Sequence, residues 1–136
     1  MNSRTKARLR AVEVLFEAEQ RDDEILDVLT RRRLHTSAQI STYSEQIVRG
    51  VQEHDEEIRE YIETYSQDWT MDRMPSVDRI LLRIGAWELL YNDEVPDLVA
   101  ISEATGLARV LSTNDSPKFI NGLLERLRQV KPTLLA

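Results

Sequence analysis

Residues 76–91 read SVDRILLRIGAWELLY, and this stretch decides the fold class of the chain. Its apolar side chains surround the predicted helix instead of forming one stripe along it. A helix that is hydrophobic nearly all round is typical of the middle of a domain, where other helices cover it. We therefore predict a central helix that begins at Ser76 and is enclosed by amphipathic helices.

Amphipathic patterns lie on both sides of this stretch. Apolar residues recur at three- and four-residue steps over about Arg4 to Gln20, and again over one long helix from about Thr42 to Tyr65. A short helix opens after the acids at 22–24. Downstream, Ser116 and Pro117 are typical of an N-cap and a first helical position. The whole chain is thus predicted to be all-α, with about seven helices.

The composition excludes several classes of function. The 136 residues contain no Cys and two widely separated His, His35 and His54, so thiol chemistry, disulfides and a metal site are not expected. No glycine-rich phosphate loop or nucleophile elbow occurs. A carboxylate site assembled across helices remains the alternative for an enzyme, but we predict no enzyme and no cofactor. No apolar run approaches the roughly 18 residues of a membrane span, so we expect a cytoplasmic protein without membrane contacts.

Charge is distributed unevenly along the chain. The net charge of −6 divides into +1 over residues 1–50 and −7 over residues 51–136. Cations nevertheless crowd the first turns of the first helix, where they oppose the helix dipole. We interpret them as phosphate contacts, although Arg10 has the alternative of a surface pair with Glu13. The four residues are Arg4, Lys6, Arg8 and Arg10.

Three stretches together resemble the NusB family of bacterial transcription antitermination factors. The first is Arg8-x-x-Ala11-Val12-x-x-Leu15-Phe16, and the second spans residues 77–89. The third runs from Val95-Pro96 to Asp115-Ser116-Pro117-Lys118-Phe119-x-Asn121-Gly122 and is the most specific. The resemblance covers essentially the whole chain. It implies one NusB-like domain, residues 1–136, of two three-helix-bundle-like subdomains, about 1–68 and 69–136, packed roughly at right angles.

The resemblance also implies a function. Members of the family bind the boxA sequence of nascent ribosomal RNA together with NusE, the small-subunit ribosomal protein ten. Their complex joins RNA polymerase and other Nus factors. A homodimer is also possible for this chain. The alternatives are a non-catalytic protein-interaction module and a detached RNA-binding domain like that of ribosomal RNA cytosine methyltransferases.

The resemblance places an arginine-rich RNA-contacting helix at the start of the chain, where Thr5 and Lys6 dilute the arginines. Near the last helix, Lys118 is the best RNA candidate, beside a helix N-terminus suited to a phosphate. Phe119 is either a core anchor or a stacking platform. The full RNA-binding set is Arg4, Lys6, Arg8, Arg10, Asp115, Lys118 and Asn121.

A second set of residues is predicted to bind the protein partner. Asp78, Arg79 and Glu88 interrupt an otherwise apolar helix. Asp78 has the alternative of a favourable interaction with the helix dipole in the first turn. We expect it to be an exposed acid that meets the basic ribosomal protein.

Overall fold

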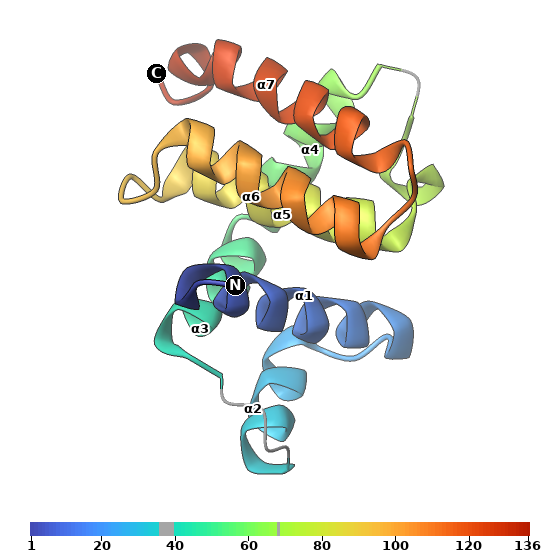
Figure 1. Cartoon of the computed structure of the whole chain (residues 1–136), viewed down its shortest axis with the longest axis vertical. Helices are drawn as coiled ribbons and strands as arrows, with labels where there is room; N and C mark the ends of the chain where they lie inside the picture. The colour runs from blue at the N-terminus through green and yellow to red at the C-terminus, as the bar shows by residue number, and fades with distance from the viewer. Residues whose placement is uncertain (36–39, 68) are drawn as a thin grey trace. The chain divides into compact units, whose positions relative to one another are not determined.

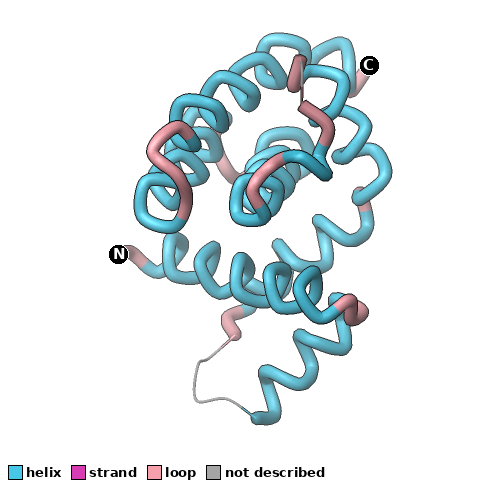
Figure 2. Tube along the Cα trace, turned by 90° about the vertical axis from the view of Figure 1, so that its right-hand side faces the viewer, coloured by secondary structure: helices cyan, strands magenta, loops and turns pink. Residues whose placement is uncertain are grey.

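The computed structural model describes residues 1–35, 40–67 and 69–136. Over these residues the chain forms seven α-helices and one short 3₁₀-helix, η1, and no strand (Figure 1; Figure 2). The predicted all-α class is therefore confirmed. The elements are α1 Ser3–Arg21, α2 Ile25–His35, α3 Thr42–Glu53, α4 Asp55–Tyr65, η1 Met71–Arg73, α5 Ser76–Tyr91, α6 Asp97–Leu111 and α7 Ser116–Leu134.

Two compact units divide the chain, Met1–Glu53 and His54–Ala136. In the first unit, α1 packs against α2 and α3. The small residues Ala7 and Ala11 are buried and allow a close approach, so that the Ser44 hydroxyl of α3 donates a hydrogen bond of 2.8 Å to the Ala7 carbonyl. The apolar stripe predicted for the first helix thus faces its neighbouring helices.

In the second unit, α5 packs against α4, α6 and α7. Every residue from Ile80 to Leu90 is buried, as the all-round apolar pattern predicts. Gly85 lets α7 come close, because a Cβ atom there would lie 2.7 Å from Leu124 Cδ1. The central helix expected from the sequence is therefore present in this unit.

The prediction of one long helix from Thr42 to Tyr65 is wrong, because the chain forms two helices there. His54 leaves the helical conformation, with φ −107° and ψ 22°. The acids at 55–57 fill the first turn of α4, where the dipole favours them. The boundary between units falls at this break instead of near residue 68, since α4 packs against α5 and α7.

The predicted cap of the last helix also needs correction. The helix α7 begins at Ser116 itself, with Asp115 in the N-cap position and without a side-chain capping bond. Ser116 does not cap the helix because its hydroxyl is buried and donates to a carboxylate oxygen of Asp78 at 2.9 Å. The first turn of α7 contains no acidic residue.

Candidate functional site

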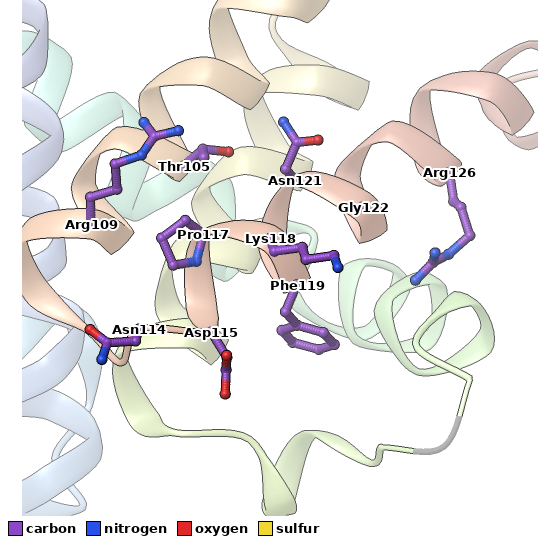
Figure 3. A pocket seen from close by; sticks show the side chains of 10 residues that line it. All are labelled: Thr105, Arg109, Asn114, Asp115, Pro117, Lys118, Phe119, Asn121, Gly122 and Arg126. Atoms are coloured by element: carbon purple, nitrogen blue, oxygen red, sulfur yellow. The ribbon is translucent and has the colours of Figure 1, made fainter.

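An open cavity of about 1060 Å³ lies in the second unit, over the end of α6 and the start of α7 (Figure 3). It contains three residues of the predicted RNA-binding set, Asp115, Lys118 and Asn121. The structure therefore brings the C-terminal part of the predicted site together. The complete lining is Thr105, Arg109, Asn114, Asp115, Pro117, Lys118, Phe119, Asn121, Gly122 and Arg126.

The charges around this cavity favour an anion. Arg109 and Lys118 are exposed and have no ion pair within the described part of the chain. Arg126 is held in place, since its Nε donates to the Tyr65 carbonyl at 3.0 Å. Asp115 is the one carboxylate among the lining residues. Three cations against one acid leave an excess of positive charge, although residues 51–136 are acidic as a whole.

The N-terminus of α7 adds a second source of positive potential. Asp115 gives it no side-chain cap, and the Lys118 amide is the one donor left in the first turn among the described residues, because Pro117 has no N–H, Ser116 N–H donates to the Thr113 carbonyl at 3.1 Å and Phe119 N–H donates to the Asp115 carbonyl at 3.2 Å. Such a donor, together with the helix dipole, attracts phosphate oxygens. In Figure 3 the Lys118 side chain extends toward the side on which Arg126 lies, whereas Asp115 points another way. The arrangement can bind phosphates but offers no nucleophile paired with a base.

A buried carboxylate supports the loop that enters the cavity. Asp78, in the first turn of α5, is only 2% exposed. It accepts hydrogen bonds from the hydroxyls of Ser112 and Ser116, which lie on the two sides of the loop between α6 and α7. Ser116 also contacts the Thr113 hydroxyl at 2.7 Å. This network fixes the backbone that carries Asn114 and Asp115.

Asp78 is therefore not the exposed acid expected from the sequence. A helix position that faces a serine-rich loop can bury a carboxylate, and the pattern of the helix alone does not reveal that loop. Glu88 is also buried, with 1% exposure. Arg79 donates to the Met74 carbonyl at 2.6 Å and to the Ser76 hydroxyl at 3.0 Å, so it stabilises the turn before α5.

The predicted cations of α1 belong to the other unit and differ from one another. The Arg4 side chain lies over the Tyr43 ring, with its guanidinium carbon 3.9 Å from the ring centroid. Arg8 is 3% exposed and lies 5.7 Å from the same centroid. Arg10 forms the predicted pair with Glu13 at 3.0 Å. Lys6 is exposed and forms no ion pair with the described residues.

Sequence reasoning missed several residues of the cavity. Arg109 resembles an ordinary cation in the last turn of α6, where the dipole favours it. Arg126 belongs to the mixed-charge face of α7, and nothing in its spacing distinguishes it. Asn114 lies in a short loop without a motif. In each case the signal appears only when α6 and α7 are packed together.

The described residues form neither a metal site nor a membrane span. No group of three or more metal-ligating side chains comes together in the ranges 1–35, 40–67 and 69–136. Within these ranges, no helix has the length and apolar character needed to cross a bilayer.

Comparison with known proteins identifies the family. The NusB family model matches residues 5–129 of the chain. The chain belongs to the NusB family. A transcription antitermination protein NusB from Arthrobacter sp. (strain FB24) is 62% identical over 136 residues, which cover 100% of both chains. This is a family of transcription antitermination factors and not of enzymes, as the sequence predicted.

Solved structures of the NusB family have the same fold. The T. maritima NusB structure is 30% identical, covers 94% of this chain and 92% of its own, and superimposes with a TM-score of 0.83. A second structure contains antitermination factors NusB and NusE in complex with double-stranded RNA. Its matching chain is 23% identical over 93% of this chain and 96% of its own, with a TM-score of 0.81, so it supports the fold alone.

Proposed function

We propose that this protein acts as an RNA-binding antitermination factor in the bacterial cytoplasm, where it binds the boxA sequence of ribosomal RNA transcripts together with NusE. The observation that carries the proposal is the cavity between the end of α6 and the start of α7, with three cations and one carboxylate. Family membership supports it, because the matching relatives are antitermination proteins. RNA polymerase and other Nus factors would then be reached through the assembled complex.

RNA would bind the cavity through its phosphates and through polar contacts to exposed bases. Lys118 and Arg109 supply charge, and the Lys118 amide in the first turn of α7 supplies a backbone donor. Asn121 and Asn114 carry amides that can both donate and accept hydrogen bonds, as contacts to base edges require. The carboxylate of Asp115 would repel the RNA phosphates and so weaken binding.

In the first unit, Arg4 and Lys6 are the strongest candidates for additional phosphate contacts, because both are exposed. Arg10 would have to share its charge with Glu13, and Arg8 is buried. We therefore assign direct contacts to Arg4 and Lys6 and a supporting role to Arg8 and Arg10.

For NusE, the proposal rests on charge. Residues 51–136 carry a net charge of −7, which suits a basic ribosomal protein. Asp78 and Glu88 are buried, so with Arg79 they would support the interface from within the fold. Exposed carboxylates are available on α4, among them Glu56 and Glu60. The double variant Glu56→Gln/Glu60→Gln should weaken NusE binding in calorimetry, whereas Asp72→Asn, an exposed acid outside α4, should not.

The decisive experiment is a titration with boxA RNA at several salt concentrations, with and without NusE. We expect weak binding by the chain alone and tighter binding with NusE. The logarithm of the affinity should fall with the logarithm of salt by about 0.7 per phosphate contact. Equal affinity for a scrambled RNA of the same composition, or an affinity independent of salt, would contradict the proposal and favour a module that binds only proteins.

A matched pair of variants tests the cavity itself. Lys118→Ala removes a cation from the cavity and should reduce the salt slope by about 0.7. Arg59→Ala removes the same charge from α4, where Arg59 pairs with Asp55 at 2.9 Å and does not line the cavity. The control should leave the slope unchanged. An equal reduction of the salt slope in both variants would mean that RNA binding depends on the net charge of the protein and not on the cavity.

A further inference from the structure

Two aromatic rings meet beside the cationic cavity. Phe119, in the first turns of α7, lines the cavity and is partly exposed. Trp69 lies in the segment between α4 and η1, and the centroids of the two rings are 5.9 Å apart at an angle of 42°. This is the usual spacing of a tilted aromatic pair. Trp69 keeps 48% of its surface exposed, although it is one of the largest apolar side chains in the protein.

Hydrogen bonds anchor the backbone at Trp69 itself and at Met71 after it. The Ser66 hydroxyl donates to the Trp69 carbonyl, and the Met71 amide donates to Glu63 Oε2 at 3.1 Å. Met71 itself is buried, with 2% exposure, and its carbonyl accepts from Arg79. The exposure of the indole is thus imposed by a fixed backbone. The exposed part of the indole, next to the Phe119 ring, is therefore available to a ligand.

The surroundings determine what such a surface can bind. Lys118 is adjacent to Phe119 on α7, and Arg126 lines the same cavity. Cations next to exposed aromatic rings are the combination that single-stranded nucleic acids require, because phosphates and base faces alternate along the strand. A lipid or an apolar peptide would satisfy the rings but not the cations.

We propose that Trp69 is a base-stacking residue of the RNA site and forms with Phe119 a two-ring platform for unpaired bases of single-stranded RNA. The inference rests on the proposed RNA-binding function and adds a contact from outside α6 and α7. Lys118 holds a phosphate of the strand while a base lies against the indole. The alternative is that Trp69 serves only as a cover for Phe119 in the folded protein.

The first test separates stacking from packing. Trp69→Leu keeps an apolar side chain but removes the π-face, and Trp69→Phe keeps a ring. We expect Trp69→Leu to weaken boxA RNA binding by about five- to a hundredfold, the range for loss of one stacked base. Trp69→Phe should recover most of the affinity. The salt slope should stay that of the wild type in both, since no charge is removed, whereas Lys118→Ala lowers it.

The second test uses RNA in which one base at a time is replaced by an abasic sugar, so that the phosphates are kept. One position should lose affinity in the wild type and not in Trp69→Leu, which demonstrates the pairing of that base with the indole. Fluorescence gives an independent signal. In Trp87→Phe, where Trp69 is the remaining tryptophan, RNA should quench the emission, and in Trp69→Phe it should not.

The outcomes distinguish the two proposals. If the wild type binds boxA RNA with the expected salt slope but Trp69→Leu binds equally well, Trp69 is only a cover and the platform is refuted. If Trp69→Leu weakens binding only in proportion to a lower thermal stability, and all abasic positions behave alike in both proteins, the platform is also refuted. If the wild type does not prefer boxA RNA, the proposed function fails, and the platform falls with it.

Discussion

The cations at the start of α1 and those of the cavity in the second unit differ in the contacts that they make within the protein. At α1, Arg4 lies on Tyr43, Arg8 is buried and Arg10 pairs with Glu13. At the cavity, Arg109 and Lys118 have no ion pair among the described residues. Three of the four α1 cations thus have contacts within their own unit, with the exposed Lys6 as the exception. Two of the three cavity cations are available to a ligand, whereas Arg126 donates to the Tyr65 carbonyl.

Charges that oppose a helix dipole can be compensated by contacts within the fold. The basic first turns of α1 suggested function because they are unfavourable for the helix alone. Other contacts offset this unfavourable interaction. Asn2 caps the helix by accepting a hydrogen bond from the Thr5 amide at 2.8 Å, and the guanidinium groups of Arg4 and Arg8 lie over the Tyr43 ring. A cation–π contact is worth about 0.5–1 kcal/mol at an exposed site, similar to the cost of a misplaced charge. The position of these cations at the start of α1 is therefore, by itself, weak evidence for contacts with RNA phosphates.

The largest effect is expected for Asp78→Ala, which removes the support of the cavity loop. Without the carboxylate, the Ser112 and Ser116 hydroxyls lose a charged acceptor in a buried place. We expect a loss of about 2–4 kcal/mol in the free energy of unfolding, measured by urea denaturation. The exposed acid Asp72 provides the control, and Asp72→Ala should change stability by less than about 0.5 kcal/mol. A similarly small change for Asp78→Ala would show that the network does not hold the loop.

Asp78 also shows which features of the structure can be predicted from the sequence. The all-round apolar pattern of residues 76–91 predicts the central helix, and it also identifies Asp78 as an exception to that pattern. The pattern does not show that the loop from Ser112 to Ser116 lies opposite this carboxylate. Partners 34 and 38 residues away are determined by the packing of α5 against α6 and α7. Periodicity reports which face is buried but not what a buried polar group meets.

The break at His54 shows a second limit. The apolar stripe from Ile47 to Ile62 continues across it with little change of period, so one helix was predicted. The His54 ring stacks on Tyr91 at 3.8 Å, and its Nδ1 lies 3.1 Å from Glu57 Oε2. These contacts to α5 and α4 favour a turn at this point and are not visible in the pattern. Lys118, by contrast, is exposed and lines the cavity. Its contact with RNA stays a prediction.

Removing one arginine from each of the two groups tests the difference between them. Arg109→Ala should weaken binding of boxA RNA by about tenfold, because its charge has no other partner among the described residues. Arg10→Ala should have less effect, since its guanidinium already binds Glu13. Affinities would be measured at the same low salt for both. A larger loss for Arg10→Ala would reverse our ranking of the two regions.

Asp115→Asn should strengthen RNA binding by a smaller amount. The carboxylate lies at the start of α7 without a capping bond, so its removal costs the helix little. It stands beside Lys118 in the cavity and repels an arriving phosphate. At roughly 6–8 Å in partly solvated surroundings, this repulsion is worth about 1–2 kcal/mol or somewhat less. Salt screens it, so the gain should shrink between low and moderate salt. An unchanged affinity at low salt would place the RNA away from Asp115.

The smallest expected effect concerns arginines that serve folding in the first unit. Glu17 of α1 accepts hydrogen bonds from Arg31 at 2.8 Å and from Arg32 at 2.9 Å. The hydrogen bond from Arg31 is the main reason why the pKa of Glu17 lies below its ordinary value of 4.5. A carboxyl group with a lowered pKa stabilises the folded state fully above its unfolded pKa. That contribution is lost as the pH falls through the folded pKa.

Glu17→Gln should therefore lower stability at pH 7 by less than about 1 kcal/mol, as for a partly exposed pair. The difference from the wild type should begin to shrink as the pH falls below about 4.5 and should disappear once the pH has passed through the lowered pKa of Glu17 in the folded protein, where the wild-type carboxyl also becomes protonated. Chemical denaturation across this range measures it. Asp27→Asn, an exposed position of α2 without an ion pair to described residues, should give a difference that does not vary in this way. If Glu17→Gln also gives a constant difference, the Arg31 and Arg32 side chains are not held by Glu17. Asp23 would then be the acid that holds Arg31, at 3.0 Å, and Glu13 the acid that holds Arg32, at 3.5 Å.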